Sequence, residues 1–327
     1  MNILITGANG YIGSHLALEL FNSSYNLFLT DRVCSHNKKD WDVLKDLMPS
    51  ANFLESDLLD FSSIHNAIHD KEIDIIFHLA AQKNPSHSIE NPLEYFSQNI
   101  NTTLNILQCS KILKIKKFIF ASSAAVYGDN SSIELHEDNF PNPINPYGSS
   151  KIICENIIKD FVQFNDFGFS AYSLRFFNPF GAKAKLKHKL NINNPMSLAE
   201  HILQSISLNN FKFNLYGHDL DTVDGSCVRD FIHIDDLVSA NMCFIEKLKA
   251  SDQEYGVFNI GSGRGLSVMQ ILSQFSTRLK LKPKITLHPK RNGDPEISIA
   301  SINNLVTNFG WQPKKTLEDL VEDTLHI

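Results

Sequence analysis

The sequence predicts an α/β fold in which a doubly wound parallel sheet is accompanied by a smaller mixed α/β domain. Short apolar runs alternate with stretches of helical periodicity through the first half of the chain, and this alternation is typical of strand–helix–strand units. The length of 327 residues also exceeds what one hydrophobic core usually serves. We therefore expect a first domain over residues 1–178 and a second over residues 179–327, with some segments of the second half returning to the first domain.

The expected strands are short apolar runs that close on glycine or a polar residue. They are Asn2–Thr6, Asn26–Thr30, Phe53–Glu55, Ile73–His78, Lys117–Ala121 and Phe169–Arg175. Helical spacing of apolar residues predicts helices over Tyr11–Phe21, Ser62–His69, Pro92–Leu113 and Pro146–Phe164. Asn145 is expected to cap the last of these helices, with Pro146 in its first turn.

The pattern changes after Asn178. Gly181–Pro195 is basic and polar without a clear period, so we expect a surface loop there that could cover a ligand. Beyond it, the sequence predicts helices and one further strand. The helices are Ser197–Ser207, Ile234–Lys249 and Ser267–Leu279, and the strand is Phe211–Tyr216. These shorter mixed elements fit a second, smaller domain.

The overall charge and the cysteines exclude several functions. The formal net charge of −6 disfavours a general binder of nucleic acid or of anionic membranes. The five cysteines form no C-x-x-C pair, so we expect reduced thiols, no disulfide framework and no metal site. The sequence shows no signal peptide and no long apolar run, and we expect a cytoplasmic protein without membrane contact.

A glycine-rich turn follows the first predicted strand. Gly7, Gly10 and Gly13 stand in T-G-A-N-G-Y-I-G, between an apolar run and a helix. Glycines there let the backbone approach a pyrophosphate, whose charge the helix N-terminus favours. Asp31 closes the second strand, where a carboxylate can bind ribose hydroxyls and repels a 2′-phosphate. The pattern predicts a Rossmann-type site for NAD rather than NADP, although Arg32 next to Asp31 weakens that preference.

Tyr147 and Lys151 form a second motif, P-Y-G-S-S-K. Because they are four residues apart on a helix, their side chains share a face and can point into one cleft. A free tyrosine has a pKa of about 10, and a nearby lysine together with a cationic nicotinamide would lower that pKa and make the phenol a base. Ser123 lies just beyond a strand end and could bridge a substrate oxygen and Tyr147. We predict these three residues to be catalytic.

These motifs resemble the extended short-chain dehydrogenase/reductase superfamily, which uses the spacing G-x-x-G-x-x-G and a Ser–Tyr–Lys trio. Four further segments are similar to the UDP-glucose 4-epimerase family. They are Tyr11–His15, Pro92–Tyr95, Arg175–Ala182 and Tyr216–Leu237. The resemblance covers almost the whole chain and is weakest at Gln82–His87 and Gly181–Pro195.

The resemblance implies the residues of an NAD site. Besides the three glycines and Asp31, they are Tyr11, Ile12, Asp57, Leu58, Lys83, Asn99 and Phe176. Asp57 would lie at the adenine ring, and a role as a helix cap is an equal alternative for it. Lys83 would contact the NAD phosphates, Asn99 would approach the cofactor, and Phe176 would line the nicotinamide.

The resemblance also implies a site for a UDP-sugar. Its residues are Asn178, Asn194, Asn214, Tyr216, Arg229, Arg291, Asp294 and Ser298. Arg229 and Arg291 would bind the diphosphate, for which the planar guanidinium fork is suited, and a surface ion pair is the alternative for each. Asn214 and Tyr216 would bind uracil through their backbone. Ser298 would line the C2 side of the sugar.

The function implied is NAD-dependent 4-epimerisation of a UDP-hexose through a transient 4-keto sugar. Ala124 and Ala125 follow Ser123, so the acid pair that a 4,6-dehydratase needs is missing. The small Ser298 predicts room for UDP-GlcNAc and UDP-GalNAc as well as UDP-glucose and UDP-galactose. A 4-epimerase or decarboxylase of a UDP-uronic acid is one alternative. A non-catalytic sensor of NAD or nucleotide sugars is another, which the intact trio disfavours.

Two long helices predict the oligomeric state. Pro92–Leu113 and Pro146–Phe164 carry apolar residues on more than one face, and in the resembled family two such helices from each subunit form a four-helix interface. The apolar residues include Ile100, Leu104, Leu107, Ile153, Ile157 and Phe161. We therefore expect a homodimer, although helices that only pack on their own sheet would look similar.

Overall fold

The computed structural model describes residues 1–325 except residues 36, 131, 194, 208–210 and 251–252. The candidate uridine residue Asn194 lies outside the described residues. The chain divides into two compact units, each with its own hydrophobic core. Unit 1 consists of Met1–Val126, Asn145–Arg175 and Val238–Phe258, and unit 2 of Tyr127–Ile144, Phe176–Leu237 and Asn259–Ile327. A segment from before residue 178 thus belongs to unit 2, and a segment from the second half belongs to unit 1.

Unit 1 is built on a seven-stranded sheet with the strand order β10-β6-β5-β4-β1-β2-β3. The strands are β1 (Asn2–Thr6), β2 (Asn26–Asp31), β3 (Asn52–Glu55), β4 (Ile75–His78), β5 (Lys117–Ser123), β6 (Ser170–Phe176) and β10 (Tyr255–Ile260). β1 pairs in parallel with β2 and β4, and β2–β3 and β4–β5 are also parallel. The chain runs outward from β1 to β3 and resumes at β4 on the other side of β1. Parallel α/β sheets bind their ligands at such a switch point.

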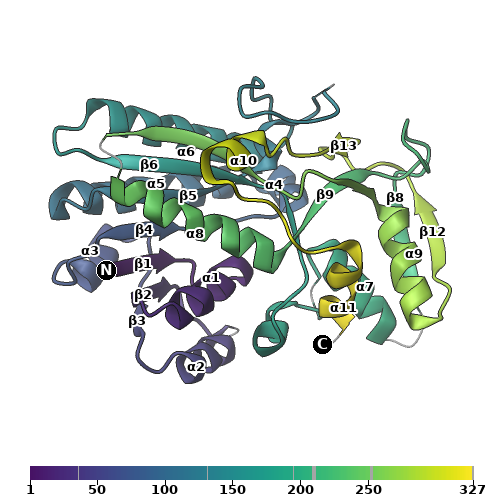
Figure 1. Ribbon diagram of the computed structural model, residues 1–327, viewed down its shortest axis with the longest axis horizontal. Coiled ribbons are helices and arrows are strands. Elements are labelled where there is room, and N and C mark those ends of the chain that lie inside the picture. Colours follow the sequence, from purple (N-terminus) through teal and green to yellow (C-terminus); the bar gives the residue numbers. More distant parts are fainter. Residues whose placement is uncertain (36, 131, 194, 208–210, 251–252, 326–327) are drawn as a thin grey trace. The chain divides into compact units, whose positions relative to one another are not determined.

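Helices cover both faces of this sheet. They are α1 (Tyr11–Asn22), α2 (Lys38–Leu47), α3 (Phe61–Ile68), α4 (Pro85–Glu90), α5 (Pro92–Leu113), α6 (Pro146–Phe164) and α8 (Ile234–Ala250), of which the part from Val238 on belongs to unit 1. One core joins β1, β4 and β5 to α3, α5 and α6 through residues such as Leu4, Phe118, Ile106 and Ile158. Figure 1 shows α1 and α8 on the opposite face. The doubly wound α/β fold that the sequence predicts is confirmed.

The N-termini of α6 and α3 show how capping residues in the sequence fix where a helix begins. The side chain of Asn145 accepts a hydrogen bond from a first-turn amide of α6, and Pro146 opens the helix, so the predicted cap is confirmed. At α3 the cap is Asp60, whose side chain accepts from the amide of Ser62. The alternative in which Asp57 caps this helix is therefore wrong.

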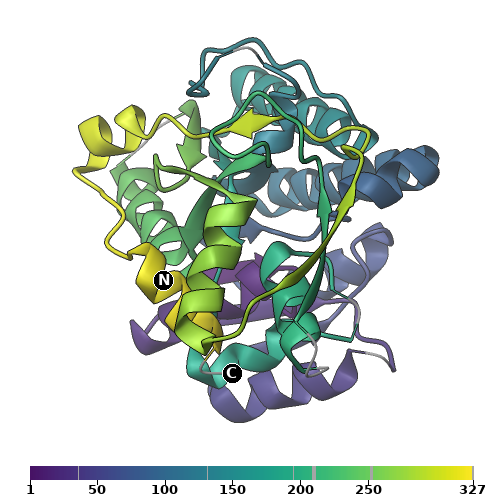
Figure 2. The ribbon, with the colours of Figure 1, turned by 90° about the vertical axis from the view of Figure 1, so that its right-hand side faces the viewer.

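Unit 2 contains a four-stranded sheet and a two-stranded sheet. Its strands are β7 (Asn178–Phe180), β8 (Lys212–Tyr216), β9 (Val228–His233), β11 (Gly265–Ser267), β12 (Lys284–His288) and β13 (Ile297–Ser298), and its helices are α7 (Leu198–Ser207), α9 (Val268–Leu279), α10 (Asn303–Phe309) and α11 (Leu317–Leu325). β9 pairs in parallel with β7 and β13 and antiparallel with β11, and β8 pairs in parallel with β12. Figure 2 shows α7, α9 and α11 packed together, with the β8–β12 pair beside them.

The segment Gly181–Pro195, predicted as a polar surface loop, contains a 3₁₀ helix over Ala184–Lys189. Leu186 in this helix is fully buried, and Leu190 after it is also buried. The prediction of a loop is wrong for this stretch, because two apolar residues anchor it although they show no helical period.

Candidate active site

The glycine-rich turn lies at the switch point of the unit 1 sheet, between β1 and α1. Gly7 has a left-handed φ of +69°, and a Cβ on it would lie 2.7 Å from the backbone nitrogen of Ala80. A Cβ on Gly13 would lie 2.2 Å from the carbonyl oxygen of Gly7. Gly10 differs, because its φ of −70° suits any residue and the nearest atom to an added Cβ is 3.1 Å away. The turn itself therefore requires Gly7 and Gly13, whereas Gly10 leaves space beside the backbone.

A cavity of about 360 Å³ opens over this turn, a volume typical of small-ligand sites. Ten predicted cofactor residues line it, namely Gly7, Gly10, Tyr11, Ile12, Gly13, Asp31, Asp57, Leu58, Lys83 and Asn99. The remaining one, Phe176, belongs to unit 2. The sequence analysis missed further lining residues, among them Asn9, Asn37 and Gln82. Gln82 follows β4, so the rule that loops at the carboxyl ends of parallel strands bind the ligand could have found it.

The residues around this cavity fit a dinucleotide. Gly10 begins α1 without a capping side chain, and the positive end of a helix dipole attracts a phosphate. The carboxylate of Asp31 lines the cavity and accepts hydrogen bonds of 2.8 Å from the amides of Asn9 and Arg32. Arg32 itself lies 3.7 Å from Asp57, with about half of its side chain exposed. A glycine cradle for phosphates and a fixed carboxylate for ribose hydroxyls are what NAD requires.

Asn99 connects the cavity wall to α6. Its side-chain oxygen accepts a hydrogen bond from the amide of Gln82 at 2.8 Å, and its side-chain nitrogen donates to the carbonyl of Gln82 at 3.1 Å. The same nitrogen donates to the hydroxyl of Ser150 at 2.9 Å. This buried amide therefore fixes the loop that carries Lys83.

The three predicted catalytic residues come together in unit 1. Tyr147 on α6 is hydrogen-bonded to Ser123 at the end of β5. The Nζ atom of Lys151, one turn later on α6, lies 5.9 Å from the centre of the Tyr147 ring. It donates a hydrogen bond of 2.7 Å to the carbonyl of Ala121, which also lines the cofactor cavity. The trio and the cavity thus meet at the carboxyl end of β5.

The segment Gln82–His87, where the resemblance is weak, leads into the short helix α4. Asn84 caps this helix by accepting a hydrogen bond from the amide of His87. The fully buried Ser88 accepts a hydrogen bond of 3.2 Å from the amide of Tyr147. The helix that follows the divergent segment therefore supports the backbone of the predicted catalytic tyrosine.

Burial shifts the pKa values of Lys151 and Tyr147. It lowers the pKa of Lys151 to about 8, while Cys154 and Glu155 act in the opposite direction. It raises the pKa of Tyr147, and the hydrogen bond to Ser123 offsets part of that rise. The expected lowering of the Tyr147 pKa is not seen in the protein alone, because desolvation of the phenolate raises this pKa by more than the hydrogen bond to Ser123 lowers it.

In unit 2, Arg229 holds a neighbouring segment in place. From β9 its guanidinium donates hydrogen bonds of 2.7, 2.9 and 3.1 Å to backbone carbonyls at Val228 and at 295–296. It also lies 3.9 Å from Asp294, and its side chain is 12% exposed. Ser298 on β13 is its register partner and is buried. Arg229 thus forms an ion pair with the partly exposed Asp294, as its alternative role expects, and also holds the segment at 295–296.

A second cluster of predicted substrate residues lies on β8, β12 and the segment that follows. Tyr216 stacks on its register partner His288, with ring centres 4.9 Å apart. The guanidinium of Arg291 lies 3.9 Å from the centre of the Tyr216 ring and is exposed. Asn214 Oδ1 lies 3.3 Å from Nε2 of His288, a residue that the sequence analysis did not include. Asn178 lies apart from this cluster, exposed on β7 beside β9.

Within the described residues, one group has the spacing of metal ligands. His233, Asp235 and Asp323 place their ligand atoms within 4.8 Å of one another. Nδ1 of His233 accepts a hydrogen bond from the Asp235 amide, so the ring proton is on Nε2, 3.1 Å from Asp323. The ammonium of Lys315 lies 2.9 Å from the same carboxylate. The ring proton of His233 and the ammonium of Lys315 both face the Asp323 carboxylate, so these contacts account for the group without a metal ion.

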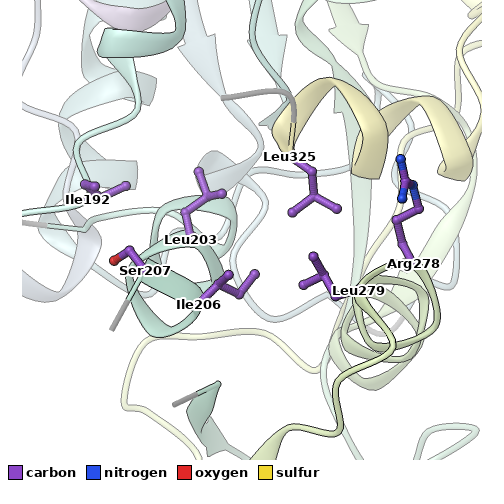
Figure 3. A pocket seen from close by; sticks show the side chains of 7 residues that line it. All are labelled: Ile192, Leu203, Ile206, Ser207, Arg278, Leu279 and Leu325. Atoms are coloured by element: carbon purple, nitrogen blue, oxygen red, sulfur yellow. The ribbon is translucent and has the colours of Figure 1, made fainter. Parts of the chain in front are cut away.

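A larger cavity of about 430 Å³ lies in unit 2. Figure 3 shows its lining, which consists of Ile192, Leu203, Ile206, Ser207, Arg278, Leu279 and Leu325. Most of these side chains are apolar, and the charged one, Arg278, is bound to the carboxylate of Glu322. The lining includes none of the predicted site residues. We therefore place the candidate active site at the cavity of unit 1, where polar groups converge.

A glycine-rich turn at the switch point with a Ser–Tyr–Lys group beside it defines a class, the dinucleotide-dependent α/β enzymes. Comparison with known proteins gives the family. The sequence profile of the NAD dependent epimerase/dehydratase family matches residues 3–261. The UDP-glucose 4-epimerase of Haemophilus influenzae is 32% identical over 327 residues, which cover 99% of this chain and 96% of that protein. The chain belongs to the NAD dependent epimerase/dehydratase family.

Solved structures agree with this assignment. The UDP-glucose-4-epimerase of Stenotrophomonas maltophila, with bound NAD and formylated UDP-arabinopyranose, has a TM-score of 0.91 and 28% identity, covering 99% of this chain and 96% of that one. The UDP-Glc/GlcNAc 4-epimerase of Campylobacter jejuni has a TM-score of 0.83 and 31% identity, covering 100% and 99%. The predicted resemblance and the predicted cofactor are confirmed at the level of the family. No helix in the described part of the chain is long and apolar enough to cross a bilayer.

Proposed function

We propose that the chain catalyses the NAD-dependent 4-epimerisation of a UDP-hexose. The observation that carries the proposal is the convergence of Ser123, Tyr147 and Lys151 at the end of β5, beside a cavity that fits a dinucleotide. A phenol held by a serine hydroxyl and close to a lysine ammonium is suited to moving a proton at an alcohol. The named activity of full-length relatives, the UDP-glucose 4-epimerases, supports the same reaction.

In this proposal the cavity of unit 1 holds NAD. The glycine turn and the start of α1 bind its pyrophosphate, and Asp31 binds its adenosine ribose. Asp57 lies at the adenine, Lys83 reaches the phosphates and Phe176 lines the nicotinamide. NAD supplies the hydride acceptor and donor, and a positive ring that favours the phenolate of Tyr147.

Tyr147 moves the proton of the reaction. It takes the proton of the 4-hydroxyl as C4 is oxidised, and it returns the proton to the same oxygen once the 4-keto sugar has turned over, so the side chain ends each cycle as it began. Ser123 holds that oxygen toward the phenol by a shared hydrogen bond. The ammonium of Lys151 stabilises the phenolate. Because the pKa of Lys151 is about 8, the ammonium form prevails at neutral pH.

The residues proposed to bind UDP belong to unit 2. Arg291 is exposed and stacked on Tyr216, so its guanidinium is available to a diphosphate. Asn214 and Tyr216 offer backbone groups to uracil, and Asn178 a side-chain amide to the diphosphate. Arg229 already binds the carbonyls at 295–296, and we propose that it supports the diphosphate while fixing this segment. Asp294 stays close to Arg229 in this arrangement, and Asn194 completes the uridine site.

We also propose that the enzyme accepts UDP-GlcNAc and UDP-GalNAc. Ser298 lies at the position that would face C2 of the sugar, where a tyrosine would restrict the site to plain hexoses. Ser298 is buried and short, so an aromatic ring is absent from this position. The name of the Campylobacter jejuni structure, a UDP-Glc/GlcNAc 4-epimerase, supports dual use within this fold.

The two alternative functions, a UDP-uronic acid enzyme and a ligand sensor, would use the same binding site. A UDP-uronic acid 4-epimerase or decarboxylase would also use the trio, and it would need a cation for the C6 carboxylate. A sensor of NAD or nucleotide sugars would bind the ligands and leave the trio idle.

A panel of UDP-sugars distinguishes the three functions. Purified protein is incubated with UDP-glucose, UDP-GlcNAc and UDP-glucuronic acid, and the products are separated by chromatography while absorbance is followed near 340 nm. We expect 4-epimers of the first two sugars, without added cofactor. Turnover of the uronic acid alone would favour the first alternative, and binding without turnover or a 340 nm signal would favour the sensor.

We further propose a cytoplasmic homodimer formed through α5 and α6. Leu93, Leu104 and Ile112 on α5 and Ile153 on α6 are exposed apolar residues, as expected of a protein interface. Of the six apolar residues that the sequence analysis names on these helices, four pack in the core of unit 1, fully or in part. They are Ile100, Leu107, Ile157 and Phe161. Leu107 is buried among the apolar residues of that core, so it belongs to the face of α5 that packs inside unit 1.

A further inference from the structure

A buried ion pair lies next to the predicted catalytic residues and has no part in the proposed reaction. On α6, Glu155 follows Lys151 by four residues, and the guanidinium of Arg175 binds both of its carboxylate oxygens, at 3.0 and 2.7 Å. One of these oxygens also accepts a hydrogen bond of 2.5 Å from the hydroxyl of Ser122. Glu155, Arg175, Ser122 and Lys151 are each at most 3% exposed. A bidentate pair with a third hydrogen bond, all out of water, holds its geometry tightly.

Glu155 links the elements that carry the catalytic groups. Ser122 on β5 comes immediately before Ser123, so its hydrogen bond to Glu155 fixes the strand end that bears the catalytic serine. Lys151 lies one turn before Glu155 and is anchored to β5 through the carbonyl of Ala121. The carboxylate is thus one hydrogen bond away from the neighbour of Ser123 and one helical turn away from Lys151.

We propose that Glu155, held by Arg175, is a positioning residue whose charge keeps Lys151 in the ammonium form and whose bond to Ser122 keeps Ser123 in place. This inference rests on the function proposed above. Lys151 and Arg175 are both buried cations, and Glu155 binds Arg175 directly while lying one helical turn from Lys151. Without that negative charge the cations repel each other in a medium of low dielectric constant. Lys151 then loses its proton first, because a guanidinium stays charged to a much higher pH.

The charge states of the groups around Lys151 show why its negative neighbour is Glu155. Burial lowers the pKa of Lys151 to about 8, and Cys154 and then the Glu155 carboxylate act against that effect, Glu155 as the one of the two that is charged at neutral pH. Burial raises the pKa values of Tyr147 and Cys154 on the same helix, so both are neutral at neutral pH. Burial lowers the pKa of His78 on β4 to about 3, so it is neutral as well. Glu155 is therefore the group that supplies negative charge to Lys151 from this set.

The test measures the pKa of Lys151 by NMR in protein labelled with ¹³C at the lysine Cε, with the signal assigned by its loss in Lys151→Met. Glu155→Gln keeps the size and the acceptor oxygen of the side chain but removes the charge. We expect the Lys151 pKa to fall by about 1 unit or more, and the alkaline limb of the kcat profile to move to lower pH with it. Glu155→Asp keeps the charge, so the Lys151 pKa should stay closer to that of the wild type even though kcat falls.

Which of the two variants, Glu155→Gln or Glu155→Asp, changes the Lys151 pKa more separates this role from a merely structural one. An ion pair that only holds the fold together makes the isosteric glutamine the milder change in every measurement, whereas the proposal makes aspartate the milder change for the Lys151 pKa. An unchanged Lys151 pKa in Glu155→Gln overturns the proposal. The matched control is Glu322→Gln, which removes the carboxylate from the pair with Arg278 in unit 2 and should leave the Lys151 pKa unchanged.

Ser122→Ala is the second variant, and it decides the matter if Glu155→Gln does not fold. It removes one hydrogen bond and no charge. We expect kcat to fall about tenfold, the scale of one hydrogen bond, with an unchanged Lys151 pKa. Full activity of Ser122→Ala overturns the positioning of Ser123. If the Lys151 pKa falls as expected in Glu155→Gln but the wild-type protein converts no UDP-hexose, the proposed function is contradicted. The role of Glu155 in the charge of Lys151 would then still stand.

Discussion

Tyr147 is the single residue on which the proposed chemistry depends most. Tyr147→Phe removes the phenolic hydroxyl and leaves the ring, so we expect kcat to fall by at least ~100-fold, the usual scale of a lost general base. Bound NAD should remain, because the residues that line the cofactor cavity do not include Tyr147. The measurement is kcat together with NAD released on denaturation. Tyr25→Phe, before β2, serves as the control, and near-normal activity of Tyr147→Phe would remove this residue from the mechanism.

Ser298 tests the sugar preference at the same scale. Ser298→Tyr adds a ring to a buried position, and overpacking of this kind costs about 1–3 kcal/mol. We expect kcat/KM for UDP-GlcNAc to fall while kcat/KM for UDP-glucose is largely retained. Ser298→Ala, which stays small, should keep both activities. Residue 298 does not set the sugar preference if the tyrosine variant uses UDP-GlcNAc as well as the wild type does, or if the wild type does not use UDP-GlcNAc.

The catalytic residues could be predicted from sequence because Tyr147 and Lys151 are one helical turn apart, so spacing alone places them together. The hydrogen bonds by which Arg229 holds the segment at 295–296 could not be predicted in this way. Its hydrogen-bond partners at 295–296 lie more than 60 positions further along the chain, and no local pattern reveals such a pairing. The raised pKa of Tyr147 was also missed, because burial depends on the whole surrounding fold.

At the scale of elements, the turn between β1 and α1 makes a sharp prediction about its glycines. Gly10→Ala should fold, since its φ is ordinary and the added Cβ makes a single close contact, 3.1 Å from the Gly7 carbonyl oxygen, that a shift of a few tenths of an ångström would relieve. The methyl group would intrude on the pyrophosphate at a cost of about 1–3 kcal/mol, which weakens NAD binding about 5- to 150-fold. Gly13→Ala should instead fail to fold stably, because its Cβ would overlap the carbonyl of Gly7. Calorimetric titration with NAD and urea unfolding check both. Undiminished NAD affinity in Gly10→Ala would place the pyrophosphate elsewhere.

The two longest helices of unit 1 could be predicted to the residue, whereas several shorter elements could not, among them the helix α2. The bounds of α5 and α6 agree with their predictions, because each has several turns of periodic sequence and α6 has a capping asparagine. β11 and β13 have three and two residues, too few to show alternation. β9 and β10 were missed although they are six residues long. Their neighbours in the sheets are distant in sequence, so nothing local marks them as strands.

At the scale of the whole molecule, the exposed apolar residues of α5 and α6 predict a homodimer. A double variant, Leu104→Glu with Ile153→Glu, places charges on this surface and should give a monomer, because burying unpaired charges opposes association. Light scattering at micromolar concentration measures the mass. Phe140→Glu, an exposed apolar residue of unit 2, is the control and should leave the dimer intact. A monomeric wild-type protein would contradict the prediction.

In the proposed function, unit 1 carries out a redox cycle that leaves NAD unchanged. The most direct measurement is the interconversion of UDP-glucose and UDP-galactose by protein purified without added cofactor, with the 4-hydrogen of the sugar replaced by deuterium. We expect NAD to copurify, the product to retain deuterium at C4, and the absorbance near 340 nm to rise only transiently. Exchange of the deuterium with solvent, or a strict requirement for added NADP, would contradict the proposed function.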